Sequence, residues 1–591
     1  MRRPPLYRQF VLLLLPVILL ATGACQRPQP EPKVPPQSAI SHERIAGTRG
    51  GSLHYRVISP PKTFNYLTAS DVDTLVVAFL LMGGRLVELD HDTQRYVPGL
   101  AETWKLADDG RQLDLTLRDG LRFSDGHPLT ADDVLFTFRA IYDERTASPV
   151  FRDAMLIGGR QIEITAPDAR RLRLVFPETI AAPENYLSNV AVLPRHALEQ
   201  ELNKGSLREA WSITTEPSRI VSAGAFTVKS VAVGESITLQ RNPFYWKKDR
   251  NGTSLPYLDT LVIDVVSDAN NAVTRLTQGA LDILDRLRPT DYATLRQSPQ
   301  SVRALDLGPG LITDHLWFNL NEGEQNGQPV VNPIKRAWFN NPRFRRAISH
   351  AIDRESIASS TLQGLATPLY GFVSPGNRAW AARDIPRADY NLEQARALLR
   401  EMGFAIRGEA SAPELYDANG NRVEFTLIVP LESEARVAMA TVIQEDLARL
   451  GIRMQVASIE TGELTRRTTQ SYDYDAALLG ISVTEPDPSS YANFLRSSSP
   501  THQWHPKEIK PATDWEARIN ELITAQARER DVQKRVAIFH DVQLIIAEQL
   551  PVVPIVARHI TSAAGMRVGN YRPSAIFPYS LWNAEELFVQ K

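Results

Sequence analysis

Alternating apolar and polar positions mark the strands of this chain. Leu113, Leu115 and Leu117 alternate with polar residues between the Asp-Gly pairs at 109–110 and 119–120. Asp-Gly supplies the positive φ that tight turns need, so this stretch predicts a half-buried strand between two turns. Similar patterns predict strands at 52–59, 161–165, 171–176, 237–246, 315–321, 451–456, 474–479 and 550–556.

Helical periodicity alternates with these strands. We expect Thr130 to cap a helix whose first turn carries Asp132 and Asp133, which complement the positive end of the helix dipole. Gly403 and Gly451 stand where a glycine ends a helix. Apolar spacing predicts further helices at 72–81, 343–357, 392–402, 437–450 and over most of 515–550. The alternation of helix and strand argues for an α/β sheet.

Length and charge narrow the class of protein. At 591 residues the chain is too long for one hydrophobic core, and we expect about two to four domains. With 43% hydrophobic and 23% charged residues, the composition suffices for sizeable cores. The formal net charge of −2 argues against a nucleic-acid partner, which needs a basic face.

The first 25 residues have the pattern of a targeting segment. Three arginines precede an apolar run at 10–21, which has the length of a signal peptide and is too short to span a bilayer. The residues before Cys25 resemble a bacterial lipobox, although Thr22 stands where lipoboxes usually carry Leu. Cys25 is the one cysteine of the chain, so it cannot form an intramolecular disulfide, and we expect it to carry a lipid anchor. The alternative is an incidental cysteine in a discarded leader.

Five blocks of sequence follow one another in a fixed order. The most specific block runs from Val97 to Phe138 and contains three Asp-Gly pairs. The others are GAFTVKSVAVGESITLQRNPFYW (224–246), NNPRFRRAISHAIDRESI (340–357), YNLEQARALLREMGF (390–404) and IQEDLARLGIRMQV (443–456). Together they resemble the bacterial extracellular solute-binding proteins of family 5, the peptide- and nickel-binding receptors of ABC importers. One block would be a weak signal, whereas five in family order are specific.

The resemblance implies an α/β fold like that of the periplasmic binding proteins, with two lobes joined by a hinge (class II type) and an extra inserted domain. The hinge strands are expected near 310–316 and 550–556, with the ligand in the crevice between the lobes. By this resemblance the chain divides into a signal peptide (1–25), a proline-rich tether (26–47), domain I (48–84, 216–312 and 556–591), an inserted domain II (85–215) and domain III (313–555).

The resemblance places the ligand site in the segment LLGISVTEPDPSSYANFL (478–495). Peptide-binding members usually carry an Asp four residues before a proline here, and that Asp pairs with the α-ammonium of the ligand. Counting back from Pro488 puts Thr484 at that position, so Glu485 or Asp487 would have to substitute, or the ligand has no buried ammonium. The candidate ligand-binding residues are Ile481, Ser482, Val483, Thr484, Glu485 and Asp487, together with Asn65 and Asn319.

Motifs of enzymes and cofactor sites are missing from the sequence. It contains no G-x-S-x-G elbow, no H-E-x-x-H and no phosphate-binding loop, so we expect no catalytic residue and no cofactor. His502 and His505 have a spacing that metal ligands can have, but they lie in a Ser/Pro-rich segment without a cysteine to complete a site. We therefore expect a surface loop there and no metal.

These observations predict a lipid-anchored solute-binding protein of an ABC importer, held at the periplasmic or outer surface of a membrane and acting as a monomer. It would bind a small polar solute, with peptide as the leading class, and deliver it to the permease subunits. One alternative is a secreted hydrolase, which would need a nucleophile–base pair that the sequence does not show. Another is a receptor that reports ligand to a signalling partner, which shares every sequence feature with the first.

Overall fold

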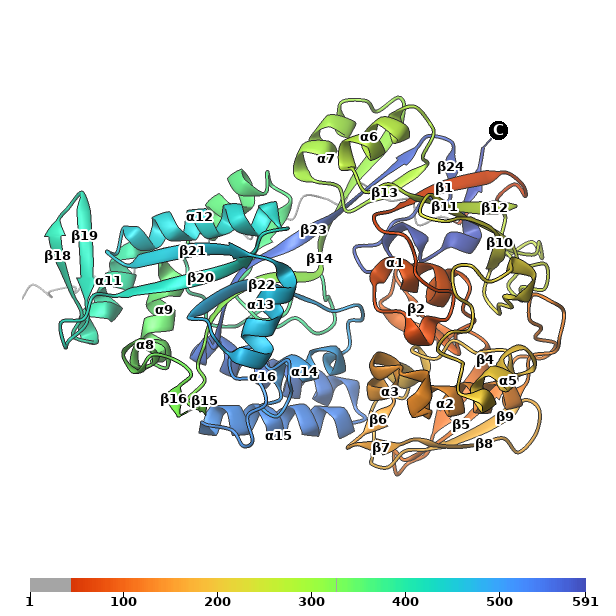
Figure 1. Ribbon diagram of the computed structural model, residues 1–591, viewed down its shortest axis with the longest axis horizontal. Helices are drawn as coiled ribbons and strands as arrows, with labels where there is room; N and C mark the ends of the chain where they lie inside the picture. Colours follow the sequence, from red (N-terminus) through yellow and green to blue (C-terminus); the bar gives the residue numbers. More distant parts are fainter. Residues whose placement is uncertain (1–43, 326, 591) are drawn as a thin grey trace, which may run out of the picture.

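Two lobes, each with its own hydrophobic core, make up the part of the chain that the computed structural model describes, residues 44–325 and 327–590 (Figure 1). The core of the first lobe gathers residues from 53–283 and from the C-terminal segment 564–587. The core of the second lobe lies between Leu311 and Ile576. Cys25 and the proline-rich segment at 26–43 lie outside the described residues.

One large sheet runs through both lobes. It has 11 strands, of which ten follow one path and β17 (Ala366–Pro368) pairs with β23. The order along the path is β10 (Phe226–Ala232), β11 (Ser236–Arg241), β12 (Thr260–Val265), β1 (Ser52–Val57), β13 (Ile283–Asp285), β23 (Val552–Gly565), β14 (Val302–Phe318), β22 (Ala476–Ser482), β20 (Glu424–Pro430) and β21 (Arg453–Ile459).

Two long strands, β14 and β23, connect the lobes. They pair antiparallel from Val302 opposite Gly565 to Trp317 opposite Val552. β13 of the first lobe pairs with the C-terminal end of β23, at residues 562–564. β22 of the second lobe pairs with the C-terminal part of β14, at residues 312–318. The register shifts between Asp306 and His315, so the ladder is irregular where it passes from one lobe to the other. This position agrees with the expected hinge, although both strands are longer than the sequence predicted.

A small antiparallel sheet is inserted in the first lobe. Its strands are, in order, β4 (Ala101–Leu106), β5 (Gln112–Leu117), β9 (Arg171–Val175) and β8 (Glu163–Thr165). β5 confirms the strand predicted between the Asp-Gly turns. Helix α2 (Ala131–Tyr142) begins with a capping box, in which the side chains of Thr130 and Asp133 each accept a hydrogen bond from the backbone N–H of the other residue. The sequence had predicted Thr130 as the cap.

The remaining helices and short strands complete the two lobes. The first lobe adds α1 (Val72–Leu75), α3 (Pro149–Ala154), α4 (Glu184–Leu187), α5 (Arg195–Lys204), α6 (Ala269–Thr277), α7 (Pro289–Arg296), β2 (Val87–Asp90), β3 (Arg95–Pro98), β6 (Leu156–Ile157), β7 (Arg160–Gln161), β24 (Val568–Gly569) and β25 (Phe588–Val589). The second lobe adds α8 (Pro333–Phe339), α9 (Pro342–Ala351), α10 (Arg354–Ser356), α11 (Leu392–Glu401), α12 (Glu434–Ala448), α13 (Thr461–Arg466), α14 (Ala492–Leu495), α15 (Asp514–Arg528), α16 (Val532–Gln549), β15 (Glu324–Gln325), β16 (Gln328–Pro329), β18 (Ala405–Glu409) and β19 (Ala412–Tyr416).

One predicted helix is interrupted. The sequence predicted a single helix over 343–357, but α9 ends at Ala351 and Ile352 is extended. The side chain of Asp353 accepts a hydrogen bond from the backbone N–H of Ser356, so it caps a separate short helix, α10. The apolar spacing continues through the break, which is why periodicity alone did not reveal it.

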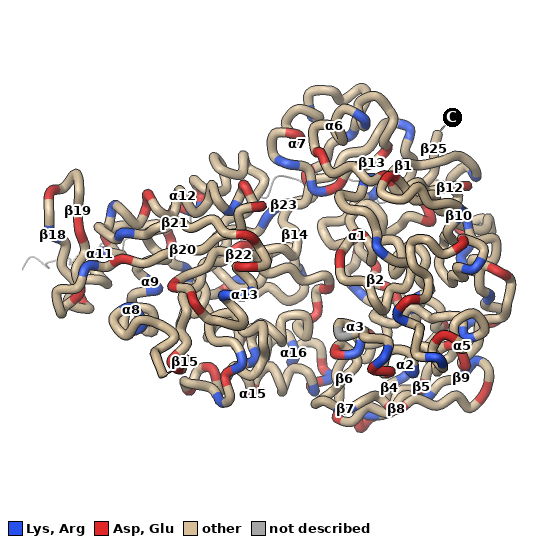
Figure 2. Tube along the Cα trace, viewed as in Figure 1, with Lys and Arg blue, Asp and Glu red and all other residues tan. Residues whose placement is uncertain are grey.

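Acidic and basic residues are interspersed along the chain in both lobes (Figure 2). Among residues 44–325 and 327–590, no helix is both long enough and apolar enough to cross a bilayer.

Candidate functional site

The lobes meet where the loop after β22, residues 483–489, faces the β2–β3 hairpin of the first lobe. The hydroxyl of Tyr96, on β3, is hydrogen-bonded to the carboxylate of Glu485 in this loop. Ser188, just after α4, donates a hydrogen bond from its hydroxyl to the other carboxylate oxygen of Glu485 at 3.1 Å. Glu485 therefore connects the second lobe to two elements of the first.

Further hydrogen bonds hold the lobes against each other. Asn185 donates from its side-chain amide to the hydroxyl of Ser489 at 2.8 Å. At the tip of the hairpin, the Gln94 amide donates to the carbonyl of Gly376 at 3.1 Å, and Arg378 donates to the carbonyl of Asp92 at 2.9 Å. The structure thus shows the two lobes in direct contact, as in a closed form of a two-lobe binding protein.

Glu485 is a half-buried carboxyl group whose hydrogen-bond partners from the first lobe are two neutral hydroxyls. Burial raises its pKa above the usual range, and the two hydroxyl donors offset only part of that effect. Burial, followed by the nearby carboxylate of Glu485, raises the pKa of Tyr96 far above its ordinary value. A cation placed here would be a stronger partner for Glu485 than the hydroxyls are.

Asp487, the other candidate anchor, is already paired within its own lobe. Its carboxylate is 3.0 Å from the guanidinium of Arg535 on α16, and both side chains are buried. It also accepts hydrogen bonds from the backbone N–H and hydroxyl of Ser489, at 2.9 and 2.7 Å. The guanidinium of Arg535 lies over the ring of Trp380, 5.0 Å from its centroid. Asp487 therefore stabilises the loop from behind, while Glu485 faces the other lobe.

The remaining candidates in the loop divide by burial. Ile481 and Val483 are buried in the core of the second lobe. Ser482 and Thr484 are exposed. Ile481 and Ser482, the last two residues of β22, point to opposite faces of the strand. Ser482 and Thr484 are thus at the surface of the second lobe, whereas Ile481 and Val483 belong to its core.

The side chains of Asn65 and Asn319 form hydrogen bonds with backbone groups of their own lobes. Asn65 is buried, caps the turn at 66–68 and donates to the carbonyl of Leu207. Asn319 is also buried and donates to the carbonyls of Tyr472 and Tyr474. It lies at the opposite end of the β14–β22 pair from the 483–489 loop, about 20 Å away along six residues of strand. The structure therefore does not bring either Asn into the contact between the lobes.

Sequence reasoning did not identify Tyr96, Asn185 or Ser188. Tyr96 directly precedes the most specific family block, but it sits in a short strand whose pattern gives no sign of a role. Asn185 and Ser188 lie in and after a four-residue helix, α4. All three owe their position to the way the lobes face each other, which no local pattern encodes.

A polar cavity of about 400 Å³ lies next to this contact, inside the first lobe. The hairpin, the segment 245–248 and the segment 578–586 line it, and Arg85 on its wall is close enough for its charge to act on Glu485. Lys247 lies in the wall between Glu88 and Glu585, with its ammonium 2.6 and 2.8 Å from their carboxylates. The volume is within the range of small-molecule sites, which is about 300–1,000 Å³.

Comparison with known proteins relates this geometry to a family. The model of the bacterial extracellular solute-binding proteins, family 5 (middle region), matches residues 95–503. A probable ABC transporter-binding protein of Deinococcus radiodurans is 27% identical over 563 residues, which cover 91% of this chain and 92% of the relative. The oligopeptide-binding protein AppA of Bacillus subtilis is 26% identical over 82% of each chain.

Solved structures share the same fold. The substrate-binding protein CtaP of Listeria monocytogenes superposes with a TM-score of 0.73 at 22% identity, over 92% of this chain and all of the other. The structure of Bacillus subtilis AppA in complex with a nonapeptide gives a TM-score of 0.68 at 24% identity, also over 92% and 100% of the two chains. The two-lobe α/β fold expected from the sequence is therefore confirmed.

Proposed function

Because the chain belongs to the bacterial extracellular solute-binding proteins of family 5, we propose that it captures a small polar solute between its two lobes and delivers it to an ABC permease. The observation that carries this proposal is the contact of Glu485 with Tyr96 and Ser188, which connects the lobes where a ligand would be enclosed. Family membership supports the transport role.

Peptide is the solute class that we propose. The Bacillus subtilis relative is named as an oligopeptide-binding protein, and two Pseudomonas aeruginosa relatives are named as di/tripeptide-binding proteins. Glu485 supplies a carboxylate that needs a cation, which the α-ammonium of a free peptide would provide. The polar cavity beside it would hold a few residues of such a ligand.

Binding would act on the equilibrium between open and closed lobes. In the open form Glu485 would be hydrated and ionised, while closure without ligand buries it against two hydroxyls. A ligand that carries an ammonium group would compensate the buried carboxylate and so favour the closed form by its differential affinity. The irregular ladder of β14 and β23 would bend as the lobes approach.

We propose further that Cys25 carries the lipid anchor, that 26–47 is the tether and that the protein works as a monomer outside the cytoplasmic membrane. The division into domain I, domain II (85–215) and domain III (313–555) is part of the same proposal. In this scheme the protein binds its solute without converting it.

The experiment that tests the proposal is mass spectrometry of small molecules released on denaturing the purified protein, followed by calorimetric titration with the identified compounds. We expect short peptides that bind at one site and are recovered unchanged after incubation. Recovery of cleaved products would favour a hydrolase. A non-peptide solute that binds tightly would leave the transport role in place and overturn the peptide assignment.

A further inference from the structure

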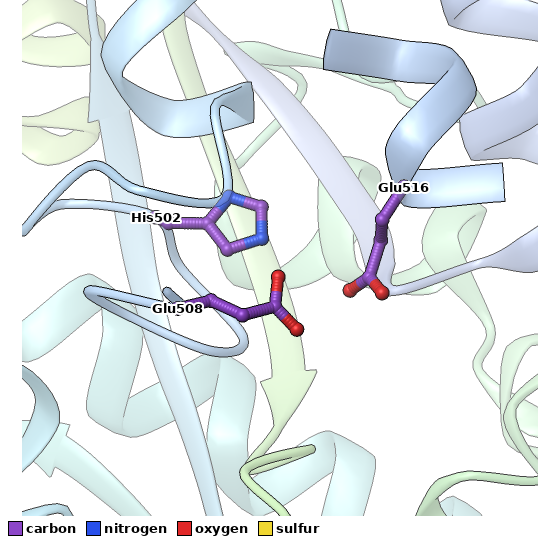
Figure 3. A group of neighbouring side chains, drawn as sticks. All are labelled: His502, Glu508 and Glu516. Atoms are coloured by element: carbon purple, nitrogen blue, oxygen red, sulfur yellow. The ribbon is translucent and has the colours of Figure 1, made fainter. Parts of the chain in front are cut away.

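Three acid–base side chains converge on one buried point in the second lobe, away from the contact between the lobes. His502, Glu508 and Glu516 each place one potential ligand atom within 4.8 Å of the other two (Figure 3). Their exposed fractions are 1%, 5% and 3%, so water hardly reaches them. The sequence had predicted a surface loop without metal at His502 and His505; the burial of His502 shows that the surface-loop prediction was wrong for this residue.

The hydrogen bonds of His502 fix where its free lone pair lies. Its Nδ1 is 3.1 Å from the backbone carbonyl of Phe494, which can only accept, so Nδ1 carries the proton. A neutral imidazole then has an unprotonated Nε2, and this atom is buried without a hydrogen-bond partner. A buried acceptor thus faces into the cluster.

Glu508 has an unused atom of the same kind. Its Oε1 accepts a hydrogen bond from the backbone N–H of Ala512 at 2.7 Å and lies 3.0 Å from Nδ1 of His505. Its Oε2 is buried and has no partner. His502 Nε2 and Glu508 Oε2 are therefore two buried acceptor atoms in one cluster, neither of which has a hydrogen-bond partner. An unpaired buried acceptor costs about 1–3 kcal/mol, so two of them require an explanation.

Glu516 is held in position from outside the cluster. Its Oε1 accepts the indole N–H of Trp504 at 2.8 Å, and its Oε2 accepts the backbone N–H and hydroxyl of Thr513 at 3.0 and 2.7 Å. Oε1, which accepts one hydrogen bond, still has a lone pair that these donors do not use, whereas Oε2 already accepts two. Arg345, a buried cation whose charge acts on Glu516, is itself bound to the carbonyls of Phe339, Gln549 and Leu550.

We propose that His502, Glu508 and Glu516 bind one divalent transition-metal ion, with Zn²⁺ as the best fit. A neutral imidazole and two carboxylates carry a charge of −2, which one divalent ion balances. The nitrogen ligand disfavours Ca²⁺ and Mg²⁺, which take oxygen ligands, whereas Zn²⁺ combines His and carboxylate ligands in a tetrahedron. Donor atoms on such a tetrahedron lie about 3.4 Å apart, so small rotations of the two Glu side chains would gather them.

The metal would hold the long irregular segment 496–513 against helix α15. Residues 496–513 connect α14 to α15 without a regular element, and the three ligands join this segment to the first turn of α15. Trp504 packs between His502 and Trp515 in the core of the second lobe, so its indole reports on the site. Because ligands come together only in the folded chain, metal binding would add to the stability of this lobe. The inference does not depend on which solute the protein carries.

The test uses untagged protein purified without chelator. We expect about one zinc per chain by elemental mass spectrometry, a melting temperature that falls by several degrees after EDTA treatment and recovers with ZnCl₂, and a zinc-dependent change in tryptophan fluorescence. Glu508→Gln should lose at least about 10-fold in zinc affinity, and His502→Gln likewise. His540→Gln is the matched control, because His540 is on the same lobe and pairs only with the exposed Asp384 at 2.7 Å.

Crystals grown with ZnCl₂ give an independent reading. An anomalous peak between the three side chains would support the proposal. Zinc content and melting temperature that are the same in Glu508→Gln and in the unaltered protein, or a site filled by water alone, would overturn it. If His502→Gln does not fold, the zinc affinity of the isosteric variant Glu508→Gln still tests the proposal.

Discussion

The hydroxyl of Tyr96 is hydrogen-bonded to the carboxylate of Glu485 across the boundary between the lobes. This contact couples the closed arrangement to the protonation and charge of one side chain. A ligand that supplies a cation at this point would replace a weak partner of Glu485 with a stronger one. The identity of the ligand group at Glu485 is therefore the property most open to measurement.

Glu485→Gln should weaken binding of free-amine peptides by about 2–5 kcal/mol, since that is the usual cost of breaking a buried charge pair. N-acetylated peptides lack the ammonium and should lose far less. Calorimetric titration of the unaltered protein and of Glu485→Gln, each with matched pairs of free and acetylated peptides, measures these two losses of affinity. Equal losses for the two kinds of peptide would show that the ammonium does not bind at Glu485, and that the ligand has no buried ammonium at this end.

Asp487→Asn provides the matched comparison within the same loop. Removing this carboxylate leaves Arg535 buried without its partner, so we expect the folded state to lose about 3–5 kcal/mol. Discrimination between free and acetylated peptides should stay unchanged, because Asp487 faces away from the first lobe. Urea unfolding together with peptide titration separates these two effects.

Closure of the lobes without ligand should depend on pH. Burial raises the pKa of Glu485 in the closed form above the ordinary value of about 4.3. Closure then takes up a proton, so it is most favourable below about pH 4.3 and weakens as the pH rises through the raised pKa. Small-angle scattering should show a larger radius of gyration at pH 7 than at pH 4, and Glu485→Gln should remove the difference. A radius independent of pH in the unaltered protein would contradict this.

Asp314 on β14 should be important for stability. It is fully buried, with Arg436 at 2.8 Å and Arg558 at 2.5 Å. Burial alone would raise its pKa, but the two guanidinium groups more than offset this and hold the pKa below its usual value. Asp314→Asn should therefore cost about 3–5 kcal/mol in urea unfolding. The exposed pair Asp114–Arg173 is the control, where Asp114→Asn should cost less than about 1 kcal/mol.

The lowered pKa of Asp314 gives a second, independent measurement. Its contribution to stability is present above the unfolded pKa of about 3.9 and is lost as the pH falls through the lower folded value. The difference in unfolding free energy between Asp314→Asn and the unaltered protein should thus shrink below about pH 4. A difference that stays constant down to pH 3 would exclude ionised Asp314 as the source.

Gly376 lies against the strands that join the lobes. A Cβ at this position would come within 2.1 Å of the carbonyl oxygen of Pro309 on β14. Gly376→Ala should therefore push the 374–378 turn off β14 and cost about 1–3 kcal/mol. Gly565→Ala on β23, where the nearest atom is 4.0 Å away, should change stability by less than about 0.5 kcal/mol. Thermal melts of both variants measure this, and equal melting temperatures would contradict it.

Cys25→Ser tests the proposed anchor. If the thiol of Cys25 carries the lipid, the variant should remain unprocessed or appear in the soluble fraction, because it would lack the acyl chains that hold the protein on the membrane. Membrane fractionation of cells that express either form gives the answer. Equal membrane partitioning of the unaltered protein and of a Cys25→Ser variant whose first 24 residues have been cleaved would rule out lipidation at this residue.

Much of the fold follows from local patterns. The two alternating runs at 161–165 and 171–176 contain β8 and β9, which pair with each other. Thr130 caps α2. The first half of β14 escaped prediction because Gly308 and Pro309 are typical of a turn, and only pairing with β23, from the far end of the chain, makes this segment a strand.

The candidate site was less accessible from sequence. Glu485 could be named because the resemblance located its loop, whereas its partner Tyr96 comes from the other lobe. His502 was assigned to a surface loop because its neighbours are Ser and Pro, and the burial of Trp504 beside it decides otherwise. In both cases the deciding contact joins segments that are distant in the chain, and residue type alone does not encode it.

The position of β23 has a consequence for how the protein is made. This strand comes last among the long strands in sequence, yet it lies in the middle of the sheet, between β13 and β14. Until the ribosome has added the residues after Val552, neither lobe has the neighbour that completes its central ladder, and the first lobe also lacks the C-terminal part of its core. We therefore expect the chain to stay incompletely folded until its C-terminal segment is present, with the insertion of β23 between β13 and β14 as a late step of folding.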